Sequence, residues 1–355
     1  MKKSIDGQRD FAQLVITWQR RHGRHDLPWQ GTRDPYAIWV SEIMLQQTQV
    51  QTVIPYFARF MARFPDVQSL AQAAEGEVLA LWSGLGYYAR GRNLHKAAQA
   101  IVSTHGGHFP HSIGNIEALP GIGRSTAAAI AVFAFGAKHA ILDGNVKRIL
   151  ARCFGIAGYP GEKKVEARLW KLAGSLLPAS SRSIASYIQG QMDLGATLCT
   201  RTRPGCAECP LTDVCIARQR QRIADFPGRK PRKALPVRDT AMLILISQYE
   251  VLFERRPASG VWGGLWCFPE LPADADVLGV ARNRYGVAGR RVQNLTPLVH
   301  GFTHFKLTIH PRIVHASSRT LRAAQPGTIW MSFEDAEQAA IPTPVRKLLA
   351  QLPRV

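Results

Sequence analysis

Apolar residues recur at helical spacing through most of the first 217 positions of the chain. Residues three or four apart lie on one face of an α-helix, so such stripes predict helices that bury one side against a core. We therefore expect residues 1–217 to form an all-α domain. The clearest stripes are Val78, Leu81, Trp82 and Leu85 in one predicted helix and Leu94, Ala97, Ala98 and Ile101 in the next.

Beyond residue 238 the pattern becomes strand-like. Two apolar runs, TAMLILIS at 240–247 and EVLFERRP at 250–257, flank Gln248 and Tyr249, a spacing typical of a β-hairpin. The sequence TPVRKLLAQL near the C-terminus again has a helical pattern. Residues 239–355 are thus predicted to be an α+β domain. The segment 218–238, which contains proline and glycine, has the composition of an interdomain linker.

The chain is strongly basic. Its 355 residues include 45 Lys and Arg against 25 Asp and Glu, a net charge of +20, and the segment 218–238 has Asp225 as its one acid. A field of this sign attracts polyanions, of which nucleic acid is the commonest, although membrane binding and simple solubility give the same signal. The longest apolar run, residues 127–137, is too short to span a bilayer, so we expect a cytoplasmic protein.

Four of the six cysteines fall between residues 199 and 215, with the spacing C-x6-C-x2-C-x5-C. In a reducing compartment, clustered thiols bind metal or do redox chemistry more often than they form disulfides. A compact loop with four thiolates favours a [4Fe–4S] cluster, because zinc sites usually have two CxxC pairs, but zinc stays open. The candidate ligands are Cys199, Cys206, Cys209 and Cys215. Cys153 and Cys267 have apolar neighbours and are predicted to be buried.

The segment ALPGIGRSTAAAI at 118–130 predicts a tight turn followed by a helix. Gly121 and Gly123 permit close backbone approach, and the residues behind them favour a helix that opens on Ser125 and Thr126. A short helix is predicted over FPHSIGNIEALP just upstream. Backbone N–H groups at such a helix start bind phosphate without reading a base, but a plain turn between packed helices has the same sequence.

Two carboxyl groups lie in unlike surroundings. Glu42 in YAIWVSEIMLQQTQV has mainly apolar neighbours, which raise a carboxyl pKa and favour the protonated acid. Asp143 in ILDGNVKR precedes a predicted helix. Such a pair is the usual apparatus for breaking a glycosidic bond, because one group donates a proton and the other stabilises the sugar cation. Taken singly, Glu42 also fits a solvated helix position and Asp143 a helix N-cap.

Five segments, in their order along the chain and in their spacing, resemble the MutY family of adenine DNA glycosylases in the helix-hairpin-helix superfamily. The resemblance runs from LPWQ at 27–30 through the second domain. It implies an all-α helix-hairpin-helix glycosylase domain with a [4Fe–4S] cluster loop, followed by an α+β nudix-like domain. It also implies a monomeric bacterial enzyme that removes adenine opposite 8-oxoguanine or guanine in double-stranded DNA. The five segments are SEIMLQQTQV, GLGYYARGRNLHKAA, LPGIGRSTA, ILDGNVKR and the four-cysteine loop.

The resemblance implies roles for individual residues. Glu42 would protonate adenine and later help activate water, Asp143 would stabilise the sugar cation, and Asn145 would orient the reacting groups. The implied DNA contacts are Gln47 and Tyr87 in the base stack, Gly121, Gly123 and Ser125 in the hairpin, and Lys147.

One hairpin position discriminates between branches of the superfamily. Relatives that also cut the DNA strand carry a lysine where this chain has Ser125. A hydroxyl cannot form the imine that strand cleavage needs, so base removal with little strand cleavage is expected. Lys147 is the remaining amine near the site, and a trace of Schiff-base chemistry there stays open.

In the second domain, GVWGGLWCFPE at 260–270 resembles the nudix-like domain of this family. Residues 271–290 lack the glutamate-rich run that holds magnesium in nudix hydrolases, so the domain is expected to recognise a base instead of hydrolysing nucleotides. Phe302, Thr303 and His304 match the family loop that contacts 8-oxoguanine, although FTHFKL also alternates like an ordinary strand.

Two other functions fit parts of this pattern. A bifunctional glycosylase and lyase for pyrimidine lesions would share the fold, but Ser125 and the added domain disfavour it. A noncatalytic DNA-binding or nucleotide-sanitising protein would leave Glu42 and Asp143 without a role.

Overall fold

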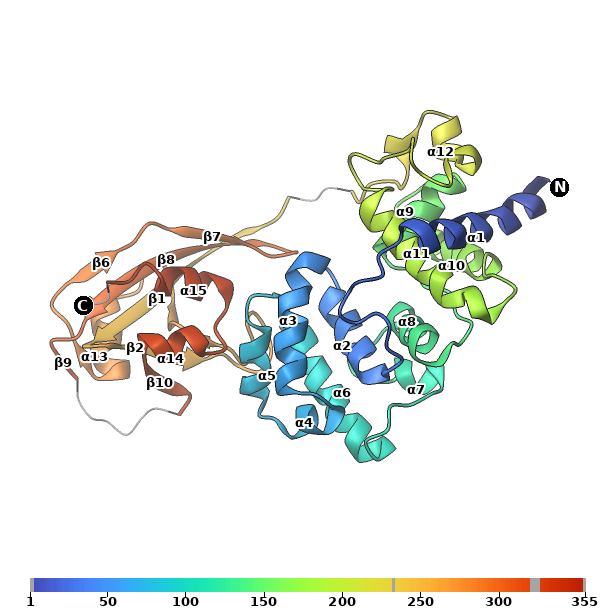
Figure 1. The fold of residues 1–355 in the computed structure, drawn as a ribbon. Helices are drawn as coiled ribbons and strands as arrows, with labels where there is room; N and C mark the ends of the chain where they lie inside the picture. The colour runs from blue at the N-terminus through green and yellow to red at the C-terminus, as the bar shows by residue number, and fades with distance from the viewer. Residues whose placement is uncertain (1–2, 232–233, 320–325, 354–355) are drawn as a thin grey trace. The chain divides into compact units, whose positions relative to one another are not determined.

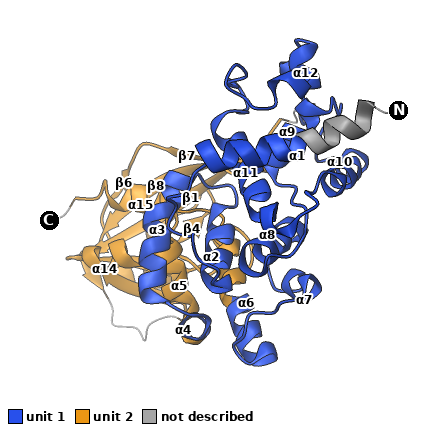
Figure 2. Cartoon of the chain, turned by 45° about the vertical axis from the view of Figure 1, so that its right-hand side comes forward, with its two compact units in different colours: residues 1–71, 96–232 blue, residues 72–95, 233–355 orange. Residues whose placement is uncertain are grey.

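The computed structural model describes residues 3–231, 234–319 and 326–353. The chain packs into two compact units that interleave along the sequence (Figure 2). Residues 1–71 and 96–232 form the first, called the helical unit below, and residues 72–95 and 233–355 form the second, the sheet unit. The boundaries predicted from the sequence divide the chain into three consecutive segments, 1–217, 218–238 and 239–355. These boundaries stay a prediction.

The helical unit consists of helices and their connections (Figure 1), and its described residues contain no β-strand, in agreement with the apolar stripes. None of the described helices is both long and apolar enough to cross a membrane. The helices lying wholly or partly in this unit are α1 (Lys3–His22), α2 (Pro35–Leu45), α3 (Val50–Arg63), α4 (Val67–Gln72), α6 (Ala89–His105), α7 (Ile113–Glu117), α8 (Arg124–Phe135), α9 (Gly144–Cys153), α10 (Lys163–Ser175), α11 (Ile184–Thr197) and α12 (Ile216–Gln219), with 3-10 turns at Ser181–Ser183, Thr212–Val214 and Ile223–Asp225.

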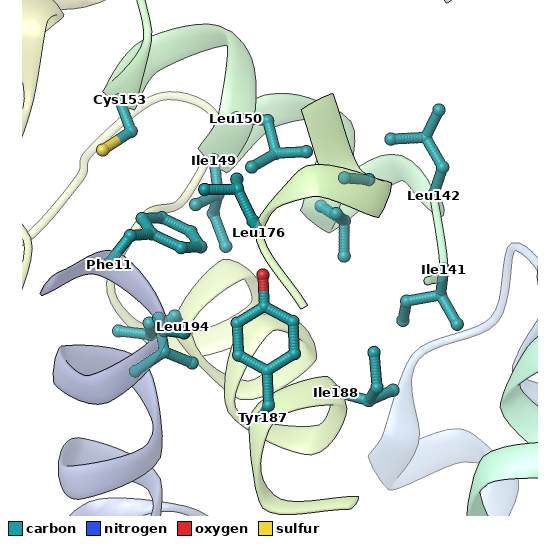
Figure 3. Close-up of a cluster of buried hydrophobic side chains, with 14 of the residues drawn as sticks. Phe11, Ile141, Leu142, Ile149, Leu150, Cys153, Leu176, Tyr187, Ile188 and Leu194 are labelled. Carbon is teal, nitrogen blue, oxygen red and sulfur yellow. The ribbon is translucent and has the colours of Figure 1, made fainter. Parts of the chain in front are cut away.

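A hydrophobic core joins α1, α9 and α11 (Figure 3). Phe11, Leu150 and Tyr187 come from these three helices and are almost completely buried. The rings of Phe11 and Tyr187 meet edge to face with their centroids 6.3 Å apart. Burying each such side chain contributes roughly 1.5–3 kcal/mol. The core therefore fixes α9 and α11, and with them the chain segments at their ends.

The sheet unit is built on a mixed sheet in which β1 (Val237–Ser247) and β8 (Lys306–His315) run parallel and the other pairs are antiparallel. The strand order is β10-β2-β1-β8-β6, with β3 on β2, β4 on β1 and β7 on β8, and β5 and β9 pair separately. The remaining strands are β2 (Glu250–Arg255), β3 (Trp266–Cys267), β4 (Glu270–Leu271), β5 (Val287–Ala288), β6 (Val292–Asn294), β7 (Leu298–Gly301), β9 (Ser318–Arg319) and β10 (Thr328–Ser332), and the helices are α13 (Val277–Tyr285), α14 (Phe333–Gln338) and α15 (Thr343–Leu349).

The two local predictions for this unit are confirmed. Ser247 pairs with Glu250, so β1 and β2 form the predicted hairpin through Gln248 and Tyr249, with Gln248 in the left-handed backbone region (φ 53°). The C-terminal segment forms α15, whose buried residues include Val345 and Leu348.

The segment 72–95 packs with the sheet although it lies early in the sequence. The Ser83 hydroxyl donates to the carbonyl of Ile341 at 2.8 Å, and the Tyr88 hydroxyl donates to the same carbonyl at 3.3 Å. The predicted helix through Leu85 was wrong at its end, because α5 (Glu75–Trp82) stops at Trp82. Gly84 follows at φ 104°, a left-handed conformation that ends a helix, and Leu85 is buried from the turn.

Candidate active site

A cleft of about 1180 Å³ opens in the helical unit, lined by α2, α8, the start of α9 and α11. Residues from widely separated segments of the chain meet on its walls. Polar groups with catalytic roles are commonly found in clefts of this kind. The sequence-predicted residues that line it are Glu42, Gln47, Ser125, Asp143 and Asn145.

Glu42 reaches the cleft from a helix that is otherwise buried. The helix α2 begins with Pro35 at its first position and Asp34 as its N-cap, whose carboxylate accepts from the backbone N–H groups of Tyr36 and Ala37. Burial raises the pKa of Glu42 to about 8, and the nearby negative charge of Asp143 adds to the rise. No described residue hydrogen-bonds its carboxyl group. Glu42 therefore keeps its proton at neutral pH and is suited to act as an acid.

Asp143 differs from Glu42 in its hydrogen bonding, because donors hold both of its carboxylate oxygens. Its Oδ1 accepts from the Val146 backbone N–H at 2.7 Å, and its Oδ2 accepts from Asn145 Nδ2 at 3.3 Å. It is the N-cap of α9, a role that its position before a predicted helix allows, and it also lines the cleft. Burial raises the pKa of Asp143, while these hydrogen bonds and the Arg148 charge oppose the rise and favour the carboxylate. Of the two carboxyl groups, Glu42 is therefore the one suited to hold a proton at neutral pH.

Asn145 is held by a network that runs from the cleft to the cysteine loop. Arg148 donates to Asn145 Oδ1 at 2.9 Å and to the Gly195 carbonyl at 2.7 Å, and its Nε donates to the Cys199 carbonyl at 2.6 Å. A Cβ atom at Gly195 would lie 2.3 Å from Asn145 Cβ, so α11 needs glycine at this point. The orientation of Asn145 therefore depends on both α11 and the cysteine loop.

The glycine turn has the predicted form of helix, turn, helix. Gly121 adopts φ 79°, a left-handed conformation that favours glycine, and Gly123 is the N-cap of α8. The helix begins at Arg124, one residue before the predicted start. Ser125 Oγ accepts from the Leu142 backbone N–H at 3.0 Å. The hairpin thereby supports the loop that delivers Asp143.

The remaining predicted DNA contacts lie in different places. Gln47 lies at the cleft, is exposed, and adopts φ 58°. Tyr87 belongs to the sheet unit, where it adopts φ 48° and is 52% exposed. Lys147 does not line the cleft, because its ammonium group pairs with Glu166 of α10 at 2.6 Å.

The four clustered cysteines line one small pocket in the helical unit. The buried Arg152 donates to Cys199 Sγ at 3.3 Å and to the carbonyl of Thr200 at 2.7 Å. No carboxylate pairs with Arg152 among the described residues. A hydrogen bond from the Cys153 thiol lowers the pKa of Cys215 to about 6. Within the part of the chain described, no group of three or more His, Cys, Asp or Glu side chains is arranged for a metal ion.

Phe302, Thr303 and His304 form a turn between β7 and β8, not a strand. The turn closes through the Phe302 backbone N–H, which donates to the Phe305 carbonyl at 2.8 Å. The Phe302 ring lies 5.5 Å from Trp262 and 4.5 Å from Phe305, centroid to centroid. Thr303 and His304 are exposed. A cluster of packed aromatic side chains thus supports the turn, and two polar side chains are exposed at its tip.

Comparison with known proteins decides the family. Residues 40–175 match the HhH-GPD superfamily of base excision DNA repair proteins, and residues 240–351 match the NUDIX domain. The chain is 37% identical to the adenine DNA glycosylase of Buchnera aphidicola over 96% of both chains. It is 33% identical to the human adenine DNA glycosylase over 95% of this chain and 73% of the human protein. The chain belongs to the adenine DNA glycosylase family. It is a DNA glycosylase of base excision repair, and DNA is its substrate.

Solved structures resemble the helical part of this glycosylase. A thermostable thymine-DNA glycosylase, 28% identical, superposes with a TM-score of 0.56 over 61% of this chain and 99% of that one. An endonuclease III structure determined in a non-covalent complex with DNA has 19% identity and a TM-score of 0.52, over 62% of this chain and 98% of that one. The second likeness supports the fold alone.

Two arginines of this glycosylase contribute to the site but were not found from the sequence. Arg148 and Arg152 follow Asp143 on α9 and reach the cysteine loop from one helix face. Their spacing of four residues was the available signal, because it places both side chains on the same side of a helix. In a chain with 45 Lys and Arg residues, that signal does not stand out.

Proposed function

We propose that this glycosylase hydrolyses the N-glycosidic bond of adenine paired with 8-oxoguanine or guanine in double-stranded DNA. The observation that carries the proposal is the meeting of two unlike carboxyl groups on one cleft. Glu42 has its pKa raised to about 8, whereas hydrogen bonds and the Arg148 charge oppose the rise in the pKa of Asp143. The glycosidic bond of a stacked base is out of reach, so the target nucleotide has to leave the helix and enter such a cleft.

The carboxyl pair supports a hydrolytic sequence of steps. Glu42 donates its proton to a ring nitrogen of adenine, and the bond between the sugar and the base breaks with its electron pair leaving on adenine. The Asp143 carboxylate stabilises the positive sugar that remains. Water then adds to the sugar carbon, and its proton passes to the Glu42 carboxylate, which restores the acid. Asn145 keeps the Asp143 carboxylate oriented through its amide hydrogen bond.

We also propose that the four-cysteine pocket holds a [4Fe–4S] cluster. The donor set fits, because four thiols face one pocket and zinc or iron would bind them as thiolates. Arg152 gives a second reason, since a buried cation without a carboxylate partner among the described residues needs anionic charge nearby. When bound, the cluster would supply folding energy to the loop. The ligands would be Cys199, Cys206, Cys209 and Cys215.

The proposed substrate contacts follow from exposure and backbone form. Thr303 and His304, exposed above Phe302, would contact 8-oxoguanine. Gln47 and Tyr87 are exposed and have left-handed backbone conformations, so we propose that their side chains insert into the base stack. Gly121 and Gly123 would offer backbone N–H groups to a phosphate. We further propose that the enzyme acts as a monomer in a bacterial cytoplasm; bacterial proteins are among its relatives.

A strand-cleavage assay tests the hydrolytic part of the proposal. The hydroxyl of Ser125 cannot form an imine, and the Lys147 amine is paired with Glu166 outside the cleft. An adenine-containing strand should therefore stay intact after excision and break only when hot alkali is added. Strand breaks in neutral buffer at the same rate as base loss would contradict hydrolysis and indicate an amine nucleophile.

A further inference from the structure

A second concave surface lies on the helical unit beside the glycine turn, away from the residues assigned above to catalysis. It is a shallow pocket of about 460 Å³ formed by the start of α8 and one side of α10. Its lining residues are Arg124, Lys163, Glu166, Ala167, Trp170 and Lys171.

The charge of this pocket is strongly positive. Arg124, Lys163 and Lys171 have no carboxylate within ion-pair distance among the described residues. The pocket's one acid, Glu166, is already neutralised, because Lys147 Nζ lies 2.6 Å from its Oε1. Three uncompensated cations around one hollow repel each other unless an anion occupies it.

Trp170 holds one of these cations in place. The Arg124 guanidinium carbon lies 4.0 Å from the centroid of the Trp170 ring, the distance of a cation–π contact. A guanidinium stacked on a ring keeps its N–H groups in its own plane, where they can donate to an acceptor.

The position of the pocket identifies the anion. Arg124 is the first residue of α8 and follows Gly123 of the turn directly. The inference rests on the phosphate contact proposed above for the glycine turn, because a strand held there would run beside Arg124. An open hollow with cations but no enclosing apolar walls suits a backbone phosphate, not a base or a free nucleotide. We propose that Arg124, Lys163 and Lys171 bind a phosphate of the DNA backbone next to the one at the glycine turn, extending the DNA-binding surface along α10.

The test compares two pairs of substitutions on the same helix. The double variant Lys163→Gln and Lys171→Gln removes two cations of the pocket. The control, Lys164→Gln and Arg168→Gln, removes the same charge from exposed residues of α10 that do not line the pocket. The measurement is the affinity for an undamaged duplex at a series of KCl concentrations. It needs no catalysis, so its outcome does not depend on adenine excision or on the proposed mispair.

The pocket variant should bind more weakly and lose salt dependence. Each phosphate contact adds about 0.9 to the magnitude of the slope of log K against log salt, and the proposal places one phosphate in the pocket, so losing it should lower that magnitude by up to about 0.9. The control should change the slope by less than half as much. Equal changes in the two variants would show that only the overall charge of α10 matters and would overturn the proposal. No change in either variant would overturn it as well.

Discussion

Replacing Glu42 with glutamine should reduce adenine excision by at least about 100-fold, in the range that loss of a general acid produces. The substitution keeps the size of the side chain and removes only the transferable proton. Because the wild-type carboxyl is already protonated at neutral pH, with its pKa raised to about 8, the neutral amide should not disturb the fold or DNA affinity. The measurement is the single-turnover rate on a duplex with adenine opposite 8-oxoguanine, under saturating enzyme.

The pH profile gives the same assignment an independent readout. The acid loses its proton as pH rises through about 8, so the wild-type rate should fall about tenfold per pH unit beyond that value. Glutamine does not titrate, so the residual rate of Glu42→Gln should lack this alkaline fall. On the acid side the rate should fall as the Asp143 carboxylate becomes protonated, and this should begin above the pKa of an ordinary aspartate.

A matched control separates the acid from general charge effects. Glu117→Gln changes an exposed glutamate at the end of α7 and should leave both the rate and its pH profile unchanged. A wild-type rate in Glu42→Gln would mean that another group protonates the base. An alkaline fall that persists in the variant would carry the same meaning.

The second large effect is expected from the cysteine pocket. Replacing Cys206 with serine should remove the iron and acid-labile sulfide from the purified protein, lower its thermal stability and weaken DNA binding. Removing one ligand of four leaves the cluster open to solvent, and metal binding supplies the folding energy of such loops. The direct measurements are iron and sulfide per chain, with about four of each expected for the wild type.

Cys153 provides the control for this experiment. It is buried, its thiol hydrogen-bonds to Cys215, and it is therefore the nearest alternative ligand. Cys153→Ala should retain full iron content. Iron loss in Cys153→Ala with retention in Cys206→Ser would show that the ligand set is wrong. Zinc bound to the wild type in place of iron would show that the pocket is a single-metal site and not a cluster site.

The sequence was sufficient for features that depend on short segments. Asp143 was placed at a helix start because a carboxylate before a helical stripe satisfies its first N–H groups, and it is the N-cap of α9. Glu42 was predicted to have a raised pKa because its immediate neighbours are apolar, and α2 is indeed buried on nearly all sides. The β-hairpin at Gln248 and Tyr249 followed from the alternation and spacing of two neighbouring runs.

Features that depend on distant partners could not be predicted. The stripe from Val78 to Leu85 indicates a buried face, but nothing in it shows that the neighbouring Ser83 and Tyr88 hydroxyls donate to the carbonyl of Ile341, more than 250 residues later. In the sequence Arg148 is one of many cations, and its role is visible only in the structure, where carbonyl groups of α11 and the cysteine loop accept its hydrogen bonds. The pairing of Lys147 with Glu166 likewise depends on how α9 and α10 meet. Patterns along the chain show which faces are buried, and the tertiary fold decides which faces meet.

The proposed enzyme excises adenine according to the base opposite it. The most direct measurement is the single-turnover rate of adenine release from three duplexes that differ only in that base: 8-oxoguanine, guanine or thymine. We expect release from the first two duplexes and none above background from the adenine–thymine duplex. Equal rates on all three, or release of an oxidised pyrimidine from a fourth duplex in place of adenine, would contradict it.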